Sequence, residues 1–144
     1  MSLTLQIQLD VRQPQAMIDK MSITVAQAYG TTETTCGVFC NPWHYSEKPI
    51  GCVGVPLPNT EVKLLDDNGR DVAVGERGEV YCRGPQVALR YWHNEQASKD
   101  SFDEEGWYKT GDVGTVNEKG FFWIVDRKKV CFLEVFFFVI TNDL

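Results

Sequence analysis

The second half of the chain consists of short strand-like runs separated by turn signals, and this pattern constrains the fold more than any other feature. Runs rich in β-branched and aromatic residues occupy residues 61–65, 78–83, 112–116 and 121–125. Residues 66–71 form a turn with Gly69 expected at positive φ, and residues 117–120 form a hairpin loop. The alternation predicts a small antiparallel β-barrel or a sandwich.

The first part of the chain differs from this β region. Residues 1–12 fit a short amphipathic strand, and Pro14–Met21 fits the end of a helix. The β-branched run that starts at Ile23 and leads to Tyr29 is expected to be a buried strand that runs into a functional loop. We expect that strand to belong to a parallel sheet whose other strands lie outside this chain, which would leave its edges open.

The chain therefore divides into four segments. The predicted fold class is α+β and mainly β: one strand and loop of a central α/β sheet, followed by a small antiparallel β-barrel subdomain. The expected segments are an N-terminal segment with the end of a helix (1–22), a strand and loop region (23–59), the β subdomain (60–129) and a hydrophobic tail (130–144).

The net charge of the chain limits the classes of partner that it is expected to bind. The 144 residues include 14 Lys and Arg against 20 Asp and Glu, which gives a formal net charge of −6. An acidic chain offers no basic field for nucleic acid or for an anionic membrane surface, so neither is expected as a partner. A bound anion would have to be held by local N–H donors or by a metal ion.

The cysteines and the apolar runs indicate where in the cell the protein is expected. The chain has five cysteines, an odd number at irregular spacing, which favours a reducing compartment with free thiols. The N-terminus lacks the features of a secretory signal, and the most apolar run, residues 130–140, is too short to span a bilayer. We expect an intracellular protein, cytoplasmic or peroxisomal.

The densest polar cluster is the run Q-A-Y-G-T-T-E-T-T at 27–35, which follows the β-branched strand. Gly30 permits close backbone approach, and Thr31 and Thr32 supply hydroxyl and N–H donors suited to phosphate oxygens. Glu33 is a hard oxygen ligand suited to Mg²⁺. From spacing alone, the run also fits a solvated Thr-rich turn that caps a helix.

Two further clusters lie in the β region. In Y-K-T-G-D at 108–112, the carboxylate of Asp112 can accept two hydrogen bonds from a vicinal diol such as ribose. The cluster V-D-R-K-K at 125–129 places Arg127 and Lys129 at the end of a strand. Taken singly, the first also fits an ordinary turn and the second a solvated charge run.

Taken together and in order, these clusters resemble the adenylate-forming (AMP-binding) superfamily. The order is Y-G-x-T-E, a Gly-rich β region, W-Y-x-T-G-D, a hairpin and D-R-x-K, and it runs from about Pro14 to Lys129. The superfamily includes acyl-CoA and 4-coumarate-CoA ligases, beetle luciferases and peptide-synthetase adenylation domains. The phrase G-F-F-W-I-V-D-R-K-K is most similar to the acyl- and aryl-CoA ligase branch.

The resemblance implies a reaction. Such enzymes activate a carboxylic acid with ATP to an acyl-adenylate, and then transfer the acyl group to coenzyme A. By this resemblance, Thr32 contacts the α-phosphate and Glu33 binds Mg²⁺, so that these two are the catalytic residues. The implied cofactors are ATP/AMP, Mg²⁺ and coenzyme A, and the implied partners are a small-molecule carboxylic acid and the nucleotide.

The resemblance also implies further binding roles. Tyr29, Gly30 and Thr31 would line the nucleotide and acyl region, although the family more often has Met where this chain has Thr31. Asp112 and Arg127 would contact the ribose. Lys129 would lie at the hinge about which a C-terminal domain rotates.

Several family elements are missing from the sequence, and this shapes the expected activity. No Ser/Thr/Gly-rich phosphate loop with its lysine is present, nor is a C-terminal domain, and residues 130–140 depart abruptly from the family pattern. We therefore expect a fragment of the large N-terminal domain that is inactive alone. Two alternatives stay open: a non-enzymatic binding module that reuses the β subdomain, and the product of a truncated gene model.

Overall fold

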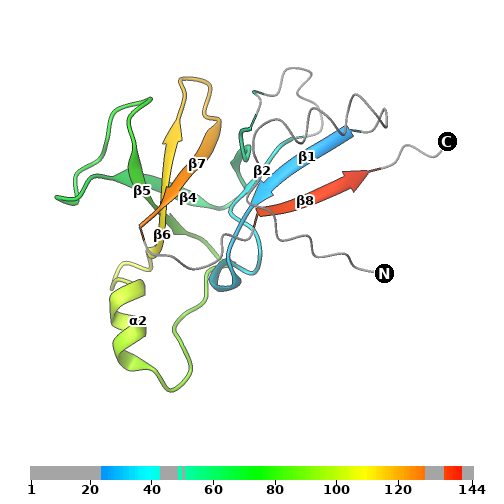
Figure 1. Cartoon of the computed structure of the whole chain (residues 1–144). Coiled ribbons are helices and arrows are strands. Elements are labelled where there is room, and N and C mark those ends of the chain that lie inside the picture. Colours follow the sequence, from blue (N-terminus) through cyan, green and yellow to red (C-terminus); the bar gives the residue numbers. More distant parts are fainter. Residues whose placement is uncertain (1–23, 43–48, 50, 129–134, 141–144) are drawn as a thin grey trace.

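The structure is a computed structural model that describes residues 24–42, 49, 51–128 and 135–140. Its elements, shown in Figure 1, are β1 (Thr24–Tyr29), the 3₁₀ turn η1 (Thr32–Thr34), β2 (Phe39–Cys40), β3 (Val55–Pro56), β4 (Glu61–Leu65), β5 (Gly78–Arg83), α2 (Glu95–Ser101), β6 (Tyr108–Val116), β7 (Phe122–Arg127) and β8 (Val135–Ile140). The expected strand at 1–12, the helix at 14–21 and the hinge Lys129 lie outside the described residues.

The β region folds into a four-stranded antiparallel sheet in the order β4-β5-β6-β7. The expected turn is present, with Gly69 at φ 75°. The hairpin loop at 117–120 is also present, because the Asn117 side-chain oxygen accepts from the backbone N–H groups of Lys119 and Phe121. Local turn chemistry therefore positions neighbouring strands as the sequence predicts.

Two details of this region differ from the expectation. The sheet is open in the described residues, and no closed barrel forms, because β4 and β7 lie at opposite ends of the strand order. The third strand begins at Tyr108 instead of Asp112, so the Thr110-Gly111 turn signal lies inside β6. Register shifts next to β6 absorb this irregularity, as β-bulges do.

Residues Glu95–Ser101 form the α-helix α2. Its N-cap is Asn94, whose side chain accepts a hydrogen bond from the Ala97 backbone N–H at 3.0 Å. Seven residues make too short a helix to be stable alone, so its contacts with the segments beside it hold it in place.

Three strands from the first part of the chain and β8 from its tail form a second antiparallel sheet, in the order β3-β2-β1-β8. β1 pairs with β2 on one side and along its whole length with β8 on the other, from Thr24 opposite Ile140 to Tyr29 opposite Val135. The expectation that β1 keeps open edges was therefore wrong. The hydrophobic tail supplies the missing neighbour, because an uncharged run of β-prone residues pairs readily with an open strand.

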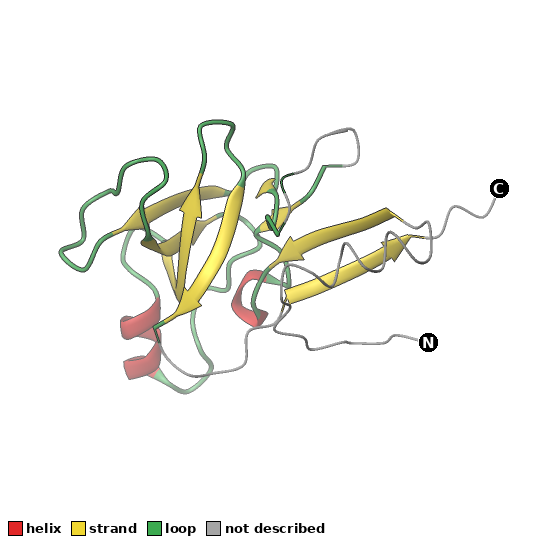
Figure 2. Cartoon of the chain, turned by 45° about the horizontal axis from the view of Figure 1, so that its top comes forward, coloured by secondary structure: helices red, strands yellow, loops and turns green. Residues whose placement is uncertain are grey.

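The two sheets share one hydrophobic core. Phe39 of β2 stacks on Phe122 of β7 with ring centroids 4.6 Å apart, and both rings are buried. Backbone hydrogen bonds also join the sheets: Val53 donates to Phe122 at 2.9 Å, and Phe122 donates to Gly54 at 2.8 Å. Figure 2 shows the resulting arrangement, with the two sheets meeting near the start of β7.

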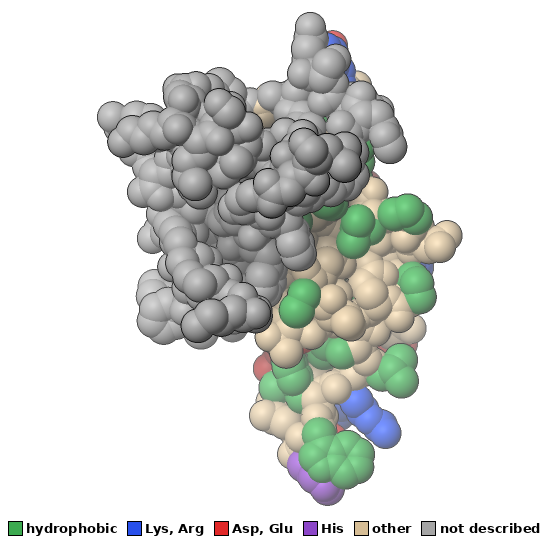
Figure 3. Space-filling view, turned by 90° about the vertical axis from the view of Figure 1, so that its right-hand side faces the viewer, with side chains coloured by type: hydrophobic (Ala, Val, Ile, Leu, Met, Phe, Trp, Pro, Cys, Tyr) green, Lys and Arg blue, Asp and Glu red, His purple; other side chains and the backbone are tan. Residues whose placement is uncertain are grey.

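Side chains on the described surface are mixed. Figure 3 shows hydrophobic groups spread over the visible described face, without one large continuous patch. The large hydrophobic side chains exposed among the described residues are Val74, Leu89, Trp92 and Val125. No helix among the described residues is long and apolar enough to cross a membrane.

Candidate nucleotide site

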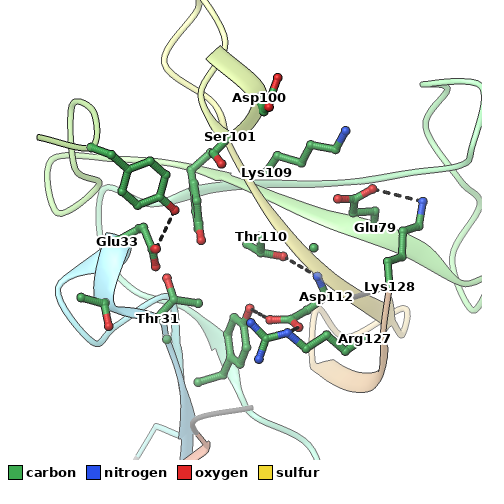
Figure 4. A pocket seen from close by; sticks show the side chains of 16 residues that line it. Thr31, Glu33, Glu79, Asp100, Ser101, Lys109, Thr110, Asp112, Arg127 and Lys128 are labelled. Carbon is green, nitrogen blue, oxygen red and sulfur yellow. Dashed lines mark hydrogen bonds and ion pairs between the residues drawn. The ribbon is translucent and has the colours of Figure 1, made fainter. Parts of the chain in front are cut away.

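A cavity of about 770 Å³ opens where the end of β1 and the turn after it face β6 and the end of β7 (Figure 4). The walls combine carboxylates, hydroxyls and cationic side chains. Sixteen residues line it: Tyr29, Gly30, Thr31, Thr32, Glu33, Glu79, Tyr91, Asp100, Ser101, Tyr108, Lys109, Thr110, Gly111, Asp112, Arg127 and Lys128. Groups from both sheets therefore converge on one polar space.

The turn after β1 is shaped by its own residues. The Thr31 backbone N–H donates to Thr34 Oγ1 at 2.8 Å, and that hydroxyl donates back to the Thr31 carbonyl at 3.0 Å. At Gly30 a Cβ atom would lie 2.3 Å from the Cys36 carbonyl carbon, so only glycine lets the backbones approach this closely. The turn leaves Thr32 exposed at the cavity.

Glu33 follows Thr32 in this turn and is partly buried. The Tyr91 hydroxyl donates a hydrogen bond to Glu33 Oε1 at 2.7 Å, a contact drawn in Figure 4. Burial raises the pKa of Glu33, but hydrogen bonds to the carboxylate, that from Tyr91 foremost, outweigh it and hold the pKa below its ordinary value. Glu33 is therefore ionised at neutral pH, and its carboxylate oxygens are able to ligate a cation.

Asp112 is the most enclosed charge in the cavity, with 1% of its surface exposed. The Tyr29 hydroxyl donates to Asp112 Oδ2 at 2.5 Å, and Arg127 Nε lies 3.2 Å from Oδ1. The Arg127 contact is an ion pair that lacks hydrogen-bond alignment, and Oδ1 has no hydrogen-bond donor. Such a buried acceptor is suited to a hydroxyl group of a bound molecule.

The strands determine this geometry. Asp112 on β6 is the direct cross-strand partner of Arg127 on β7. Thr110 precedes it on β6: its hydroxyl donates to the Val80 carbonyl at 2.8 Å and accepts from the Asp112 N–H at 3.1 Å. The ion pair and the Tyr29 hydroxyl thus hold the carboxylate, and the Thr110 hydroxyl holds the backbone of Asp112.

Burial affects both members of the Tyr29–Asp112 pair. It raises the pKa of Asp112 above its ordinary 3.8, against the opposing effects of the Tyr29 hydrogen bond and of Arg127. Burial, and then the neighbouring Asp112 charge, hold the pKa of Tyr29 well above 10.0. Tyr29 therefore keeps its proton and acts as a hydrogen-bond donor.

A second group of charges is centred on Lys128, which lines the cavity. Lys128 Nζ contacts Asp67 Oδ1 at 2.6 Å and Glu79 Oε2 at 3.1 Å. Hydrogen bonds to these two carboxylates raise the pKa of Lys128, so its positive charge is retained. Glu79 is buried, and no sequence motif pointed to its place in the site, because it lies within a regular strand pattern.

The structure brings most of the predicted site residues into this cavity: Tyr29, Gly30, Thr31, Thr32, Glu33, Asp112 and Arg127 all line it. Sequence reasoning missed Tyr91 and Tyr108, since aromatic residues in a β region are usually assigned to the core or its rim. The feature of the sequence that could have identified them as site residues is the phenolic hydroxyl that each side chain carries.

The donor set also bears on the expected metal. Among the described residues, no group of three or more His, Cys, Asp or Glu side chains could hold a metal ion by itself. Glu33 is a single carboxylate, so it fits a Mg²⁺ ion that keeps waters and is held largely by a nucleotide's phosphates.

Comparison with known proteins gives a consistent result. The family profile described as AMP-binding enzyme matches residues 8–92. A long-chain-fatty-acid–CoA ligase of Yersinia pestis is 45% identical over 121 residues, which cover 82% of this chain and 21% of that protein. A probable 4-coumarate–CoA ligase 2 of Dictyostelium discoideum is 39% identical and is matched over 76% of this chain and 20% of its own length.

Solved structures of CoA ligases are also similar to this chain. The crystal structure of the anthranilate CoA ligase AuaEII in complex with anthranoyl-AMP superposes with a TM-score of 0.75 at 31% identity, over 83% of this chain and 22% of that one. ATP-bound MatB from Rhodopseudomonas palustris gives a TM-score of 0.77 at 29% identity, over 83% of this chain and 24% of that one. The chain spans about a fifth of the length of the curated relatives that it matches. Because the profile covers more than half of the residues, the chain belongs to the AMP-binding enzyme family.

Proposed function

We propose that this chain forms the AMP side of the nucleotide site of an AMP-forming acyl-CoA ligase. The observation that carries the proposal is the buried Asp112 carboxylate, whose Oδ1 lacks a hydrogen-bond donor at the cavity. A ribose hydroxyl supplies the donor that this oxygen lacks. Arg127, which is paired with the same oxygen, adds a second contact to the sugar.

The turn after β1 serves the phosphate in this proposal. Thr32 is exposed at the cavity and contacts the α-phosphate, and Tyr29, Gly30 and Thr31 line the nucleotide beside it. Glu33 binds Mg²⁺, which offsets negative charge as the acyl-adenylate and pyrophosphate form. Lys129 is the hinge in the same proposal. In the whole enzyme the acyl group passes from the adenylate to coenzyme A.

The proposal extends to substrate and location. The similar proteins include ligases named for long-chain fatty acids, 4-coumarate and anthranilate, so the substrate proposed is a small-molecule carboxylic acid without a narrower class. Cys36, Cys40 and Cys82 are free thiols, which supports a reducing compartment, the cytoplasm or the peroxisome.

AMP binding tests the proposed site. AMP affinity is measured by isothermal titration calorimetry for the unmodified chain, Asp112→Ala and Asp71→Ala, after circular dichroism has shown that all three are folded. Asp112 is a buried carboxylate of the site, whereas Asp71 is an exposed carboxylate outside it. A hydrogen bond to a charged group contributes about 1.5–3 kcal/mol, so Asp112→Ala is expected to weaken AMP binding about ten- to a hundredfold. Asp71→Ala should bind as the unmodified chain does. Equal AMP affinity in all three chains contradicts the proposal.

Turnover is a separate expectation. A chain of these 144 residues lacks the phosphate loop and the C-terminal lysine of the family, and loss of one positioned electrostatic contact commonly lowers the rate by about 10²–10³. We expect no carboxylate-dependent exchange of pyrophosphate into ATP across a panel of fatty and aromatic acids. Exchange well above a heat-denatured control would show that the chain is catalytically sufficient.

A further inference from the structure

The segment 84–91, which we call the strap, crosses the turn that carries Thr32 and Glu33. Two backbone contacts attach it: the Ala88 N–H donates to the Glu33 carbonyl at 2.7 Å, and the Thr35 hydroxyl donates to the Gln86 carbonyl at 2.9 Å. The strap thus contacts the turn at Glu33 and at Thr35. It ends at Tyr91, whose hydroxyl donates to Glu33 Oε1 at 2.7 Å.

Tyr91 itself is held from the opposite direction. Its backbone N–H donates to Ser98 Oγ of α2 at 2.9 Å, and its ring packs edge-on against Phe102 with centroids 5.5 Å apart. Both contacts fix the ring without using the hydroxyl. The hydroxyl position is therefore set by the helix, and Glu33 receives a donor at a defined point.

The hydrogen bond from Tyr91 restricts the side chain of Glu33. A carboxylate at the end of a long side chain samples several rotamers, and a donor fixed on one oxygen limits them. Limiting the rotamers of a ligand is one way in which groups around a metal site orient the residue that holds the ion.

We propose that Tyr91 is a positioning residue: its hydroxyl holds the Glu33 carboxylate in the orientation that accepts a divalent cation accompanying the nucleotide. The inference rests on the proposed function, since it takes the cavity to be a nucleotide site. It assigns a role to the strap, which lies far from Glu33 in sequence.

The test uses Tyr91→Phe, which removes the hydroxyl and keeps both the ring packing and the backbone hydrogen bond to α2. Tyr81→Phe is the matched control, because Tyr81 is partly buried on β5 and does not line the cavity. Glu33→Gln removes the carboxylate charge. Mn²⁺ is the probe, titrated into the ¹⁵N-labelled chain with AMP present, and the broadening of the amide signals of residues 31–34 reports binding at Glu33.

We expect Tyr91→Phe to raise the Mn²⁺ concentration for half-maximal broadening about tenfold, the usual effect of removing a group that orients a metal ligand. Tyr81→Phe should leave it unchanged, and Glu33→Gln should abolish the localised broadening. AMP affinity measured in EDTA should fall much less than tenfold in Tyr91→Phe, because the AMP contacts proposed at Asp112, Arg127 and Thr32 do not involve this hydroxyl. A purely structural role for Tyr91 predicts instead that AMP affinity without metal falls together with Mn²⁺ affinity.

Three results would overturn the inference. One is an unchanged Mn²⁺ midpoint in Tyr91→Phe, and another is Mn²⁺ broadening of residues 31–34 that persists in Glu33→Gln. The third is an equal loss of AMP affinity in EDTA. The AMP measurement with Asp112→Ala is independent of the metal, so intact Asp112-dependent AMP binding with a failed Mn²⁺ result rejects the role of Tyr91 alone. Loss of Asp112-dependent AMP binding rejects the proposed function and, with it, this inference.

Discussion

The hydrogen bond between Tyr29 and Asp112 permits a quantitative prediction. Tyr29→Phe removes the hydroxyl that donates to Asp112 Oδ2 at 2.5 Å, at a site where both side chains are 1% exposed. Water cannot replace the donor easily, and Oδ1 already lacks one. A hydrogen bond to a charged group contributes about 1.5–3 kcal/mol, so the free energy of unfolding at neutral pH should fall by about 2 kcal/mol.

The charge of Asp112 should account for about half of that loss. Phe retains the ring that packs against Phe39 at 5.8 Å, so the substitution adds little cavity volume. In an Asp112→Asn background the acceptor is neutral, and a neutral hydrogen bond contributes about 1 kcal/mol. Tyr29→Phe should therefore cost about 1 kcal/mol less in that background, which is the coupling free energy between the two residues.

The assay is equilibrium unfolding in urea at neutral pH, followed by far-ultraviolet circular dichroism. Four chains complete the cycle: the unmodified protein, each single variant and the double variant. Tyr81→Phe serves as a control outside the site and should change stability by no more than about 0.5 kcal/mol. Equal costs of Tyr29→Phe in both backgrounds, or a cost in the unmodified background no larger than that of the control, would refute the reasoning.

Three further predictions concern the backbone, the sheet edge and pH. Gly30→Ala should lower stability by about 1–3 kcal/mol in thermal unfolding, because its Cβ would lie 2.3 Å from the Cys36 carbonyl carbon. Deletion of residues 135–144 removes β8, so hydrogen exchange should accelerate for β1 amides and stay unchanged in the β4–β7 sheet; equal protection of β1 in both chains contradicts the pairing. Burial raises the pKa of Asp112 above 3.8 in the folded state, so the folded chain binds this proton more tightly than the unfolded chain does. The free energy of unfolding should therefore fall as pH rises from the unfolded to the folded pKa of this group. The stability of Asp112→Asn relative to the unmodified chain should therefore increase from about pH 4 to about pH 7, and a flat difference contradicts the raised pKa.

Features that depend on neighbouring residues were predictable from the sequence. The turn at Gly69 and the hairpin at 117–120 follow from residue types that favour those backbone conformations, and the structure has both. The residues chosen for the site by motif order, among them Glu33 in the turn after β1 and Asp112 on β6, lie in one cavity although they are far apart in sequence. Their binding roles stay predictions.

Features that depend on distant pairings were not predictable. Closure of a barrel requires the two outer strands of a sheet to meet, and local alternation carries no information on that point; here β4 and β7 stay apart in the strand order. The pairing of β8 with β1 joins the two ends of the described chain. The hydroxyl of Tyr91 acquires its partner Glu33 only through the path of the strap.

The separation between Tyr29 and Asp112 has a consequence for how the protein is made. The two residues are 83 positions apart, and their hydrogen bond joins the first strand to the sixth. During synthesis, β1 leaves the ribosome long before β6 exists, so the cavity has only one wall for most of that time. Contacts of such long range form slowly, because much of the chain must be ordered before they appear. A nucleotide that contacts both walls would bind only chains in which the two sheets have already joined. Its binding would therefore shift the equilibrium from partly folded chains toward folded ones.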